Sequence, residues 1–481
     1  MQMPETRRGP VLSTVRRGAV GVALALATAI LPTPTALAQA GPTPSDTSEA
    51  LKIPHQVRKL DNGLTVIFHE DHRQPLVVVN LNVNVGSRDE PAKRTGFAHL
   101  FEHLMFMGTQ KVPEKMFDAW MEAEGGWNNA WTSNDRTDYY DVGPSHALPL
   151  LLWMEADRFG TLGSQIDQAK LDTQRGVVRN ERRQQVENTP YGKAELELPG
   201  LLFPIGHPYH HPVIGSHEDL EAASVNDVRE FFADNYVAPN FSLVVAGDFD
   251  PNATMGQIET YFGGLPKKEP VERPKPGTVA ELKGVVRKEM RDQVTLPKLV
   301  MAWLSPALYA PGDAELDLLS EIMSEGKASR LYKALVYDRK IAQNVAAYQG
   351  SMALRSHFNV EVVARPGVTM EQLEQAVDAE LARLRDEPVT SAELNRAKNQ
   401  YEASFVRRMQ ALSTRAAMLN GYFASKGEPD WTARDLKRYL DATAADLQRV
   451  AKDVLDPDRR VILHILPKED ESSTQDGAGS P

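Results

Sequence analysis

Two histidines that are four residues apart, with a glutamate beside the second, constrain this chain more than any other feature. They are His99 and His103, with Glu102, inside the apolar stretch 97–107. Residues i and i+4 of a helix project from one face, so both imidazoles can reach a single ion. Glu102 shares that face and is close enough to hold a water on the same ion. The spacing therefore predicts a helix that carries two metal ligands next to a carboxylate.

A third ligand is needed, because a catalytic zinc takes three protein ligands and leaves one position open for water. The helix supplies two of them, so the third comes from elsewhere in the chain. Glu181 is the best candidate, since Val177 and Val178 form an apolar patch among long polar side chains and predict a second helix over 174–184. Packed against the first helix, its carboxylate would complete a His, His, Glu site for one Zn²⁺ per chain.

Five short motifs follow one another along the chain. They are LDNGLTV at 60–66, GSRDE at 86–90, GFAHLFEHL at 96–104, NAWT at 129–132 and VRNERR at 178–183. In this order they resemble the pitrilysin/insulinase-type metallopeptidases, which include the mitochondrial processing peptidases, and H-x-x-E-H is the inverzincin signature. The resemblance covers roughly residues 52–467.

The resemblance implies a role for each residue of the candidate site. By position, His99, His103 and Glu181 match the zinc ligands, and Glu102 matches the catalytic base. Zinc held by two neutral imidazoles and one carboxylate keeps positive charge, activates a water and polarises a peptide carbonyl. Glu102 would accept the proton of that water and pass it to the leaving amine. The predicted function is therefore a zinc-dependent endopeptidase that hydrolyses peptides or unfolded segments.

Two further predictions follow from the same resemblance. The family often has a second glutamate seven residues before the ligand glutamate, and Gln174 stands there. Its amide can hydrogen-bond beside the ligands but adds no charge. The NAWT motif matches the edge strand to which a substrate adds as an extra strand, so Asn129, Ala130 and Thr132 are the predicted substrate contacts. Without the resemblance, a buried polar turn after 125–126 is the alternative.

A non-catalytic role, as a structural or partner subunit of a related peptidase complex, is the alternative function. The intact set of His99, Glu102, His103 and Glu181 argues against it, because loss of activity usually shows first at these positions. A net charge of −11 argues against nucleic acid as a partner and agrees with a peptide substrate.

The N-terminus has the pattern of an export signal, which we predict over residues 1–40. Four arginines precede the apolar run 18–30, and small residues follow it at 36–40. The run is short for a membrane span, so we expect no stable anchor, with an uncleaved anchor as the alternative. The chain has no cysteine, which excludes disulfides and a lipid-modified cysteine. We expect a periplasmic or secreted protein, with a flexible leader at 41–51 and a disordered tail at 468–481.

A linker divides the remaining chain into two halves. The stretch 266–285 begins with four prolines among alternating charges, which is typical of a linker. Segments on either side resemble each other at nearly constant spacing, for example 166–172 and 389–395. The pattern suggests duplicated domains, which we place at 52–265 and 286–467.

Each half mixes alternating strands with amphipathic helices. Residues 79–85 and 358–363 alternate between apolar and polar side chains, and 370–385 keeps helical spacing. We therefore predict an α+β fold of two similar domains, each a mainly antiparallel sheet covered by helices. The resemblance implies that the two close like a clam shell around a chamber. Only the first half carries H-x-x-E-H, so we expect the second to be non-catalytic.

The second half lacks the substrate-holding pair that the resemblance implies. The family usually offers an Arg and a Tyr seven residues apart, and the alignment places Val336 and Gln343 at these positions. We expect a related, zinc-less chain to supply the pair in a heterodimer, with a homodimer as the other form of assembly. The alternative is that a nearby side chain substitutes for the pair: Arg330, Tyr332, Tyr337 or Arg339.

A second histidine cluster comprises His207, His210, His211 and His217. Its spacing resembles that of a metal site, but two prolines interrupt it, and no carboxylate stands at helical spacing with the pair His210 and His211. We predict a structural loop for this segment.

Overall fold

The computed structural model describes residues 51–269, 271–273 and 280–468. The predicted export signal, the leader apart from Leu51, the tail beyond Lys468 and part of the linker lie outside the described residues. Within the described ranges, no helix has the length and apolar character needed to cross a bilayer. Export to the periplasm, or secretion, therefore stays a prediction.

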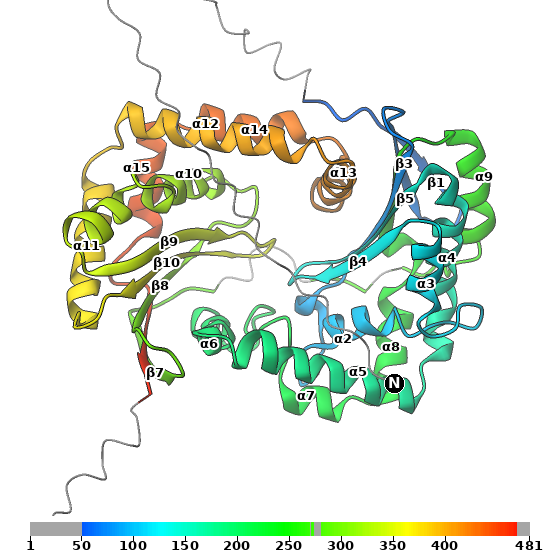
Figure 1. Ribbon diagram of the computed structural model, residues 1–481, viewed down its shortest axis with the longest axis horizontal. Coiled ribbons are helices and arrows are strands. Elements are labelled where there is room, and N and C mark those ends of the chain that lie inside the picture. Colours follow the sequence, from blue (N-terminus) through cyan, green and yellow to red (C-terminus); the bar gives the residue numbers. More distant parts are fainter. Residues whose placement is uncertain (1–50, 270, 274–279, 469–481) are drawn as a thin grey trace, which may run out of the picture. The chain divides into compact units, whose positions relative to one another are not determined.

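The described chain contains two β-sheets (Figure 1), and their strand orders correspond apart from the extra strand β1 in the first. The first has the order β1-β2-β6-β3-β5-β4, formed by β1 (Gln56–Lys59), β2 (Thr65–Glu70), β3 (Leu76–Val83), β4 (Trp127–Thr132), β5 (Thr137–Pro144) and β6 (Phe241–Gly247). The second has the order β7-β11-β8-β10-β9, formed by β7 (Val286–Asp292), β8 (Lys298–Ser305), β9 (Ala342–Gly350), β10 (Ser356–Ala364) and β11 (Val461–Pro467).

Strand directions repeat as well. β2 lies parallel to β6, and β7 lies parallel to β11, whereas the other pairs in both sheets are antiparallel. Apart from β1, each strand of the first sheet thus has a counterpart in the second. The predicted α+β fold with two similar, mainly antiparallel sheets is confirmed. The chamber that the resemblance implies stays a prediction.

Helices accompany both sheets (Figure 1). Those between β3 and the linker are α2 (Phe97–Leu104), α3 (Met116–Ala123), α4 (Leu148–Gln165), α5 (Gln168–Glu181), α6 (Gly192–Leu202), α7 (His217–Ala222), α8 (Val225–Asn235) and α9 (Pro251–Phe262). The later ones are α10 (Asp313–Ser324), α11 (Met370–Asp386), α12 (Ser391–Arg408), α13 (Leu412–Lys426), α14 (Thr432–Asp441) and α15 (Ala444–Val454). Short 3₁₀ segments lie at Ser87–Asp89, Ser145–Ala147 and Ala238–Asn240, and π-helical segments at Arg182–Glu187 and Tyr332–Asp338.

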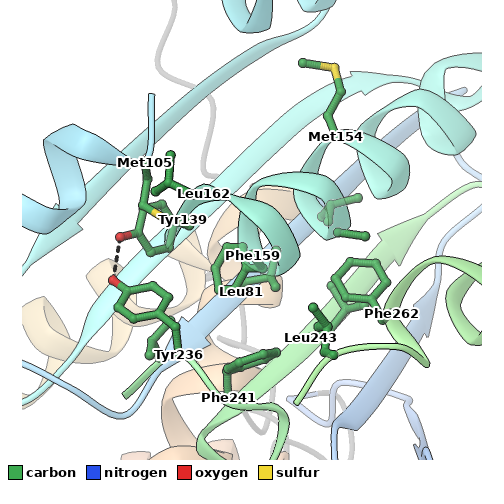
Figure 2. Close-up of a cluster of buried hydrophobic side chains, with 14 of the residues drawn as sticks. Leu81, Met105, Tyr139, Met154, Phe159, Leu162, Tyr236, Phe241, Leu243 and Phe262 are labelled. Carbon is green, nitrogen blue, oxygen red and sulfur yellow. Dashed lines mark hydrogen bonds between the residues drawn. The ribbon is translucent and has the colours of Figure 1, made fainter. Parts of the chain in front are cut away.

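The largest apolar core lies between the first sheet and the helices that pack on it, α4 among them (Figure 2). Because side chains alternate along a strand, Val79, Leu81 and Val83 of β3 all face this core. Tyr139 and Tyr236 are buried in it as well, and their hydroxyls share a hydrogen bond of 2.8 Å (Figure 2). The bond satisfies two polar groups that would be costly to bury alone.

The other face of β3 is buried by a helix from far along the chain. α13 packs against β3 and β6, where Val78 and Val244 meet Leu419. Asn80, which alternates with the core residues of β3, is also buried, and the Asn420 side-chain amide donates to its Oδ1 (2.7 Å) and its main-chain oxygen (3.1 Å). The first sheet is therefore covered on one face by a helix that follows the second sheet's strand β10 in the sequence.

Candidate metal centre and active site

The start of α2 is fixed by a carboxylate from a preceding loop. Gly96 precedes the helix with a φ of 89°, a left-handed conformation that glycine adopts easily. Glu90 accepts the N–H groups of Gly96 (2.9 Å) and Ala98 (2.8 Å). Such first-turn N–H groups have no partner inside the helix, and a carboxylate there also suits the helix dipole. In the sequence, Glu90 is only the last letter of the GSRDE motif, and a loop contact of this kind leaves no periodic signal.

The side chains of His99, His103 and Glu181 meet where α2 packs against α5. Their ligand atoms all lie within 4.8 Å of one another. Glu181 Oε2 is 3.1 Å from His103 Nε2 and 3.8 Å from His99 Nε2. In the part of the chain that the structure describes, this is the one group of at least three such side chains close enough to share a metal ion.

Glu181 is the last residue of α5, and the backbone continues as the wider π-helical turn Arg182–Glu187. The predicted helix over 174–184 is therefore α-helical only up to Glu181. π-Helical turns are rare and often lie at functional sites. Arg182 donates to Glu187 (2.8 Å) and to the Gly215 carbonyl, and these bonds hold the chain directly behind the candidate ligand.

Burial and neighbouring groups favour the metal-binding forms of these side chains. Burial lowers the pKa of His99 to about 4, and the charge of His103 adds to this effect. The hydrogen bond with His103 is the main reason why the pKa of Glu181 lies below its usual range. A neutral imidazole and an ionised carboxylate are the forms that bind a metal. Two imidazole nitrogens and one carboxylate oxygen are donors that zinc accepts, so the residues present fit this ion.

Glu102 lies on the same helix face and is only 9% exposed. Thr132, the last residue of β4, donates its hydroxyl to Glu102 Oε2. Burial raises the pKa of Glu102, and the hydrogen bond from Thr132 partly opposes this shift. A carboxylate whose pKa is raised toward neutral pH is suited to take up and release a proton. The arrangement thus joins a candidate general base to the candidate metal site.

β4 is the edge strand of the first sheet, with β5 on one side and no strand of the described chain on the other. Its side chains alternate between exposed and half-buried, so the alternative of a buried polar turn at NAWT is wrong. Asn129 Oδ1 accepts the N–H of Ala130 at 2.8 Å. That Asn129, Ala130 and Thr132 contact a substrate stays a prediction.

A cleft of about 420 Å³ lies in front of Glu102 and His103. Its other walls include Asp118 and Glu122 of α3 and Trp127 at the start of β4. Its volume is within the range of clefts that hold small ligands. A peptide side chain therefore has room beside the candidate base.

Two polar groups that could orient the candidate ligands make no such hydrogen bond among the described residues. The Gln174 amide donates to the Met107 sulfur at 2.6 Å and, within the described residues, makes no hydrogen bond to the three candidate ligands. His99 Nδ1 is buried and has no hydrogen-bond partner among the described residues. The influence of Gln174 on the ligands stays a prediction.

The second histidine cluster is held by local hydrogen bonds. His207 Nδ1 accepts the N–H of Tyr209 (3.0 Å), and His210 Nδ1 donates to the Phe203 carbonyl (2.7 Å). His217 begins α7 and pairs with Glu187 at 3.0 Å, so it lies outside the loop predicted for this segment. For the other three histidines the predicted loop is confirmed.

The side chains that could replace the missing Arg and Tyr pair fall into two groups. Arg330 makes a two-pronged ion pair with Glu393 (2.7 and 2.9 Å), and Tyr332 packs against the core of the second sheet. Both therefore serve internal packing. Tyr337 and Arg339 are exposed. Whether either of them holds a substrate stays a prediction.

Two family models match this chain. Residues 65–197 match "Insulinase (Peptidase family M16)", and residues 222–401 match "Peptidase M16 inactive domain". The first match includes His99, Glu102, His103 and Glu181. The second match contains no H-x-x-E-H sequence.

Similar proteins and structures agree with these matches. The zinc protease PqqE of Helicobacter pylori is 26% identical over 416 residues, which cover 86% of this chain and 93% of that protein. The crystal structure of a protease from Helicobacter pylori, 25% identical, superposes with a TM-score of 0.81 and covers 86% of this chain and 100% of that one. The probable mitochondrial-processing peptidase subunit beta of Schizosaccharomyces pombe is 30% identical over 206 residues, 43% of this chain and 44% of that protein.

Proposed function

Because this chain belongs to the insulinase family, peptidase family M16, we propose that it is a zinc-dependent endopeptidase that hydrolyses peptides or unfolded segments. In this proposal, residues 52–265 form the zinc-binding domain and 286–467 a related domain without catalytic residues. The proposal rests on one observation. The ligand atoms of His99, His103 and Glu181 lie within 4.8 Å of one another, and the buried Glu102 lies on the same face of α2 as the two histidines.

In the proposed reaction, His99, His103 and Glu181 hold one zinc ion. Bound zinc supplies a water of lowered pKa and polarises the peptide carbonyl. Glu102 accepts the proton of the attacking water at a carboxylate oxygen and then gives it to the leaving amine nitrogen. The Thr132 hydroxyl holds that carboxylate in place between the two transfers.

The open edge of β4 is the proposed place of the substrate. A peptide that adds there as an extra strand pairs through its main chain, which holds many different sequences in one position. The N–H of Ala130 is now bonded to Asn129 Oδ1, so an incoming strand replaces this side chain as its partner. Because Thr132 of the same strand contacts Glu102, the peptide is brought past the candidate base.

Removing the metal is expected to abolish cleavage. We expect the purified chain to contain zinc and to cleave a peptide mixture, to lose both after dialysis against a chelator, and to recover both when zinc is added. Glu181→Gln should lower the zinc content measured by mass spectrometry, because the amide brings no negative charge to the cation. Glu259→Gln, on the exposed face of α9, is the matched control and should keep its zinc. Cleavage that is equally fast in the chelator contradicts the proposal.

We also propose that a related, zinc-less chain completes the substrate site. Support comes from Val336 and Gln343, which stand where the family offers an Arg and a Tyr, and from Arg330, whose guanidinium is already bound by Glu393. The expected result is that a related chain copurifies with this one and that the mixture cleaves peptides faster than this chain alone. A purified chain that cleaves as fast alone as in any mixture excludes the partner.

A further inference from the structure

A second cavity lies at the far end of β4 from the active-site cleft. Its volume is about 630 Å³, and its wall is rich in aromatic rings: Trp131, Tyr309, Tyr401, Phe405 and Tyr422. β4 and the turn that follows it form one side, and α12 and α13 form much of the other. Cavities of this size, with mostly apolar walls, are the usual sites for binding small groups.

The cavity is continuous with the edge strand of the active site. Trp127, Asn129 and Trp131 form the exposed face of β4. The first two line the cleft at Glu102 and His103, and Trp131 lines the aromatic cavity. Thr132, the next residue, donates to the candidate base Glu102. A peptide strand that lies along β4 therefore leads from the active site to the cavity.

Asp135, in the cavity wall, ties the turn after β4 to the loop between β9 and β10. Its Oδ1 accepts from Arg88 (2.7 Å) and from the Tyr209 hydroxyl, and its Oδ2 accepts the N–H of Ala353 (2.9 Å). Ala353 lies in the loop between β9 and β10, so the bond joins the turn after β4 directly to the second sheet. These hydrogen bonds hold this part of the cavity wall in place.

The charged groups of the wall are already engaged. Arg136 pairs with Asp138 (3.1 Å) and lies 5.0 Å from the centre of the Trp131 ring. Asp435 accepts from the Tyr422 hydroxyl (2.8 Å) and from Arg438. Arg408 lies over the Phe405 ring. Because these charges have partners or ring faces, an uncharged, apolar group suits the cavity better than an ionised one.

We propose that this cavity holds a large apolar side chain of the peptide substrate, preferably an aromatic one. The inference rests on the proposed endopeptidase function and adds a site that selects one residue near the cut. Trp131 follows the cleft residue Asn129 by two residues on the same face of β4, and a strand advances about 3.4 Å per residue, so the selected residue lies within about four positions of the cleaved bond. The two sheets then both take part in choosing the substrate.

The test is a position scan with peptides that share one cleavage site. Phe or Ala stands in turn at each of four positions on either side of the cleaved bond, and kcat/KM is measured for each peptide. At one position, wild-type protein should prefer Phe over Ala about tenfold to a hundredfold, since burial of such a side chain is worth that much. Ala417→Phe, which fills the cavity from α13, should remove this preference while the zinc content stays at the wild-type level.

Two further variants separate the inference from effects on folding. Ala379→Phe, at an exposed position of α11 away from the cavity, is the matched control and should keep the preference. Met418→Ala, which widens the cavity, should shift the preference from Phe toward Trp. A wild-type enzyme that cleaves all peptides without preference, or Ala417→Phe protein that keeps the wild-type preference, overturns the inference alone. A wild-type chain that cleaves none of the peptides overturns the proposed function, and this inference with it.

Discussion

Replacing Glu102 with Gln is expected to lower peptide cleavage by about a hundredfold to ten-thousandfold while the chain keeps its zinc. The amide has the shape of the carboxylate and can still accept the hydrogen bond that Thr132 donates, so the local structure should persist. It cannot accept a proton at neutral pH, and positioned proton transfer contributes a factor of this size. The measurement is kcat/KM on a reference peptide, together with the zinc content of the same sample.

A matched control for this variant lies in the same cleft. Glu122 lines it from α3 and not from α2, which carries the candidate ligands His99 and His103, and Glu122→Gln should change the rate only slightly. Glu102→Gln protein that holds zinc and cleaves at the wild-type rate would show that another group acts as the base. Loss of zinc in this variant would show that Glu102 contributes to metal binding as well.

Arg158→Ala is expected to destabilise the protein by about 3–5 kcal/mol, because it leaves a buried carboxylate without its partner. Arg158 is fully buried and donates to Glu155 through Nε (2.8 Å) and Nη2 (2.5 Å). Its guanidinium also lies 4.5 Å from the centre of the Phe117 ring and 4.8 Å from that of Tyr139. The free energy of unfolding, from denaturant titration of wild type and variant, measures the effect.

The expected loss of stability is large because a second buried acid, Asp141, interacts with Glu155. Asp141 is also fully buried, and burial together with Glu155 raises its pKa far above the usual range. Without Arg158, two acids would share an apolar site with no cation. The double variant Arg158→Met with Glu155→Leu removes the ion pair and leaves Asp141 as the remaining acid, so it should recover part of the lost stability. A single variant within about 1 kcal/mol of wild type would show that water or relaxation reaches this site.

The candidate metal site could be predicted because its chemistry imposes a spacing. Two imidazoles four residues apart on a helix share one face, so His99 and His103 stand out in the sequence. Glu181 is a candidate through its own predicted helix, and the family resemblance singles it out. Glu90 could not be found in this way. It acts through two main-chain N–H groups of a loop and helix start, and no repeat or pattern marks such a contact.

The strand β3 shows a similar limit. Alternation from Val79 onward predicts a strand with two unlike faces, and the structure contains that strand. Its polar face is nevertheless buried, because Asn420, 340 positions away in the sequence, bonds to Asn80. A pattern within ten residues says which face is polar but cannot name the partner that covers it. The same holds for the cavity beside Trp131, which is assembled from segments that are distant in sequence.

The position of α13 limits how this protein can be divided or recombined. One face of the first sheet, whose edge strand contacts Glu102, is covered by α13 through Leu419 and Asn420, which lie far along the chain. Cut at the proline-rich stretch, the N-terminal fragment would present Ile67, Val78 and Val244 to solvent. We therefore expect the N-terminal half not to fold stably without α13. A chimera that exchanges the halves of two relatives must keep the first sheet together with its own α13.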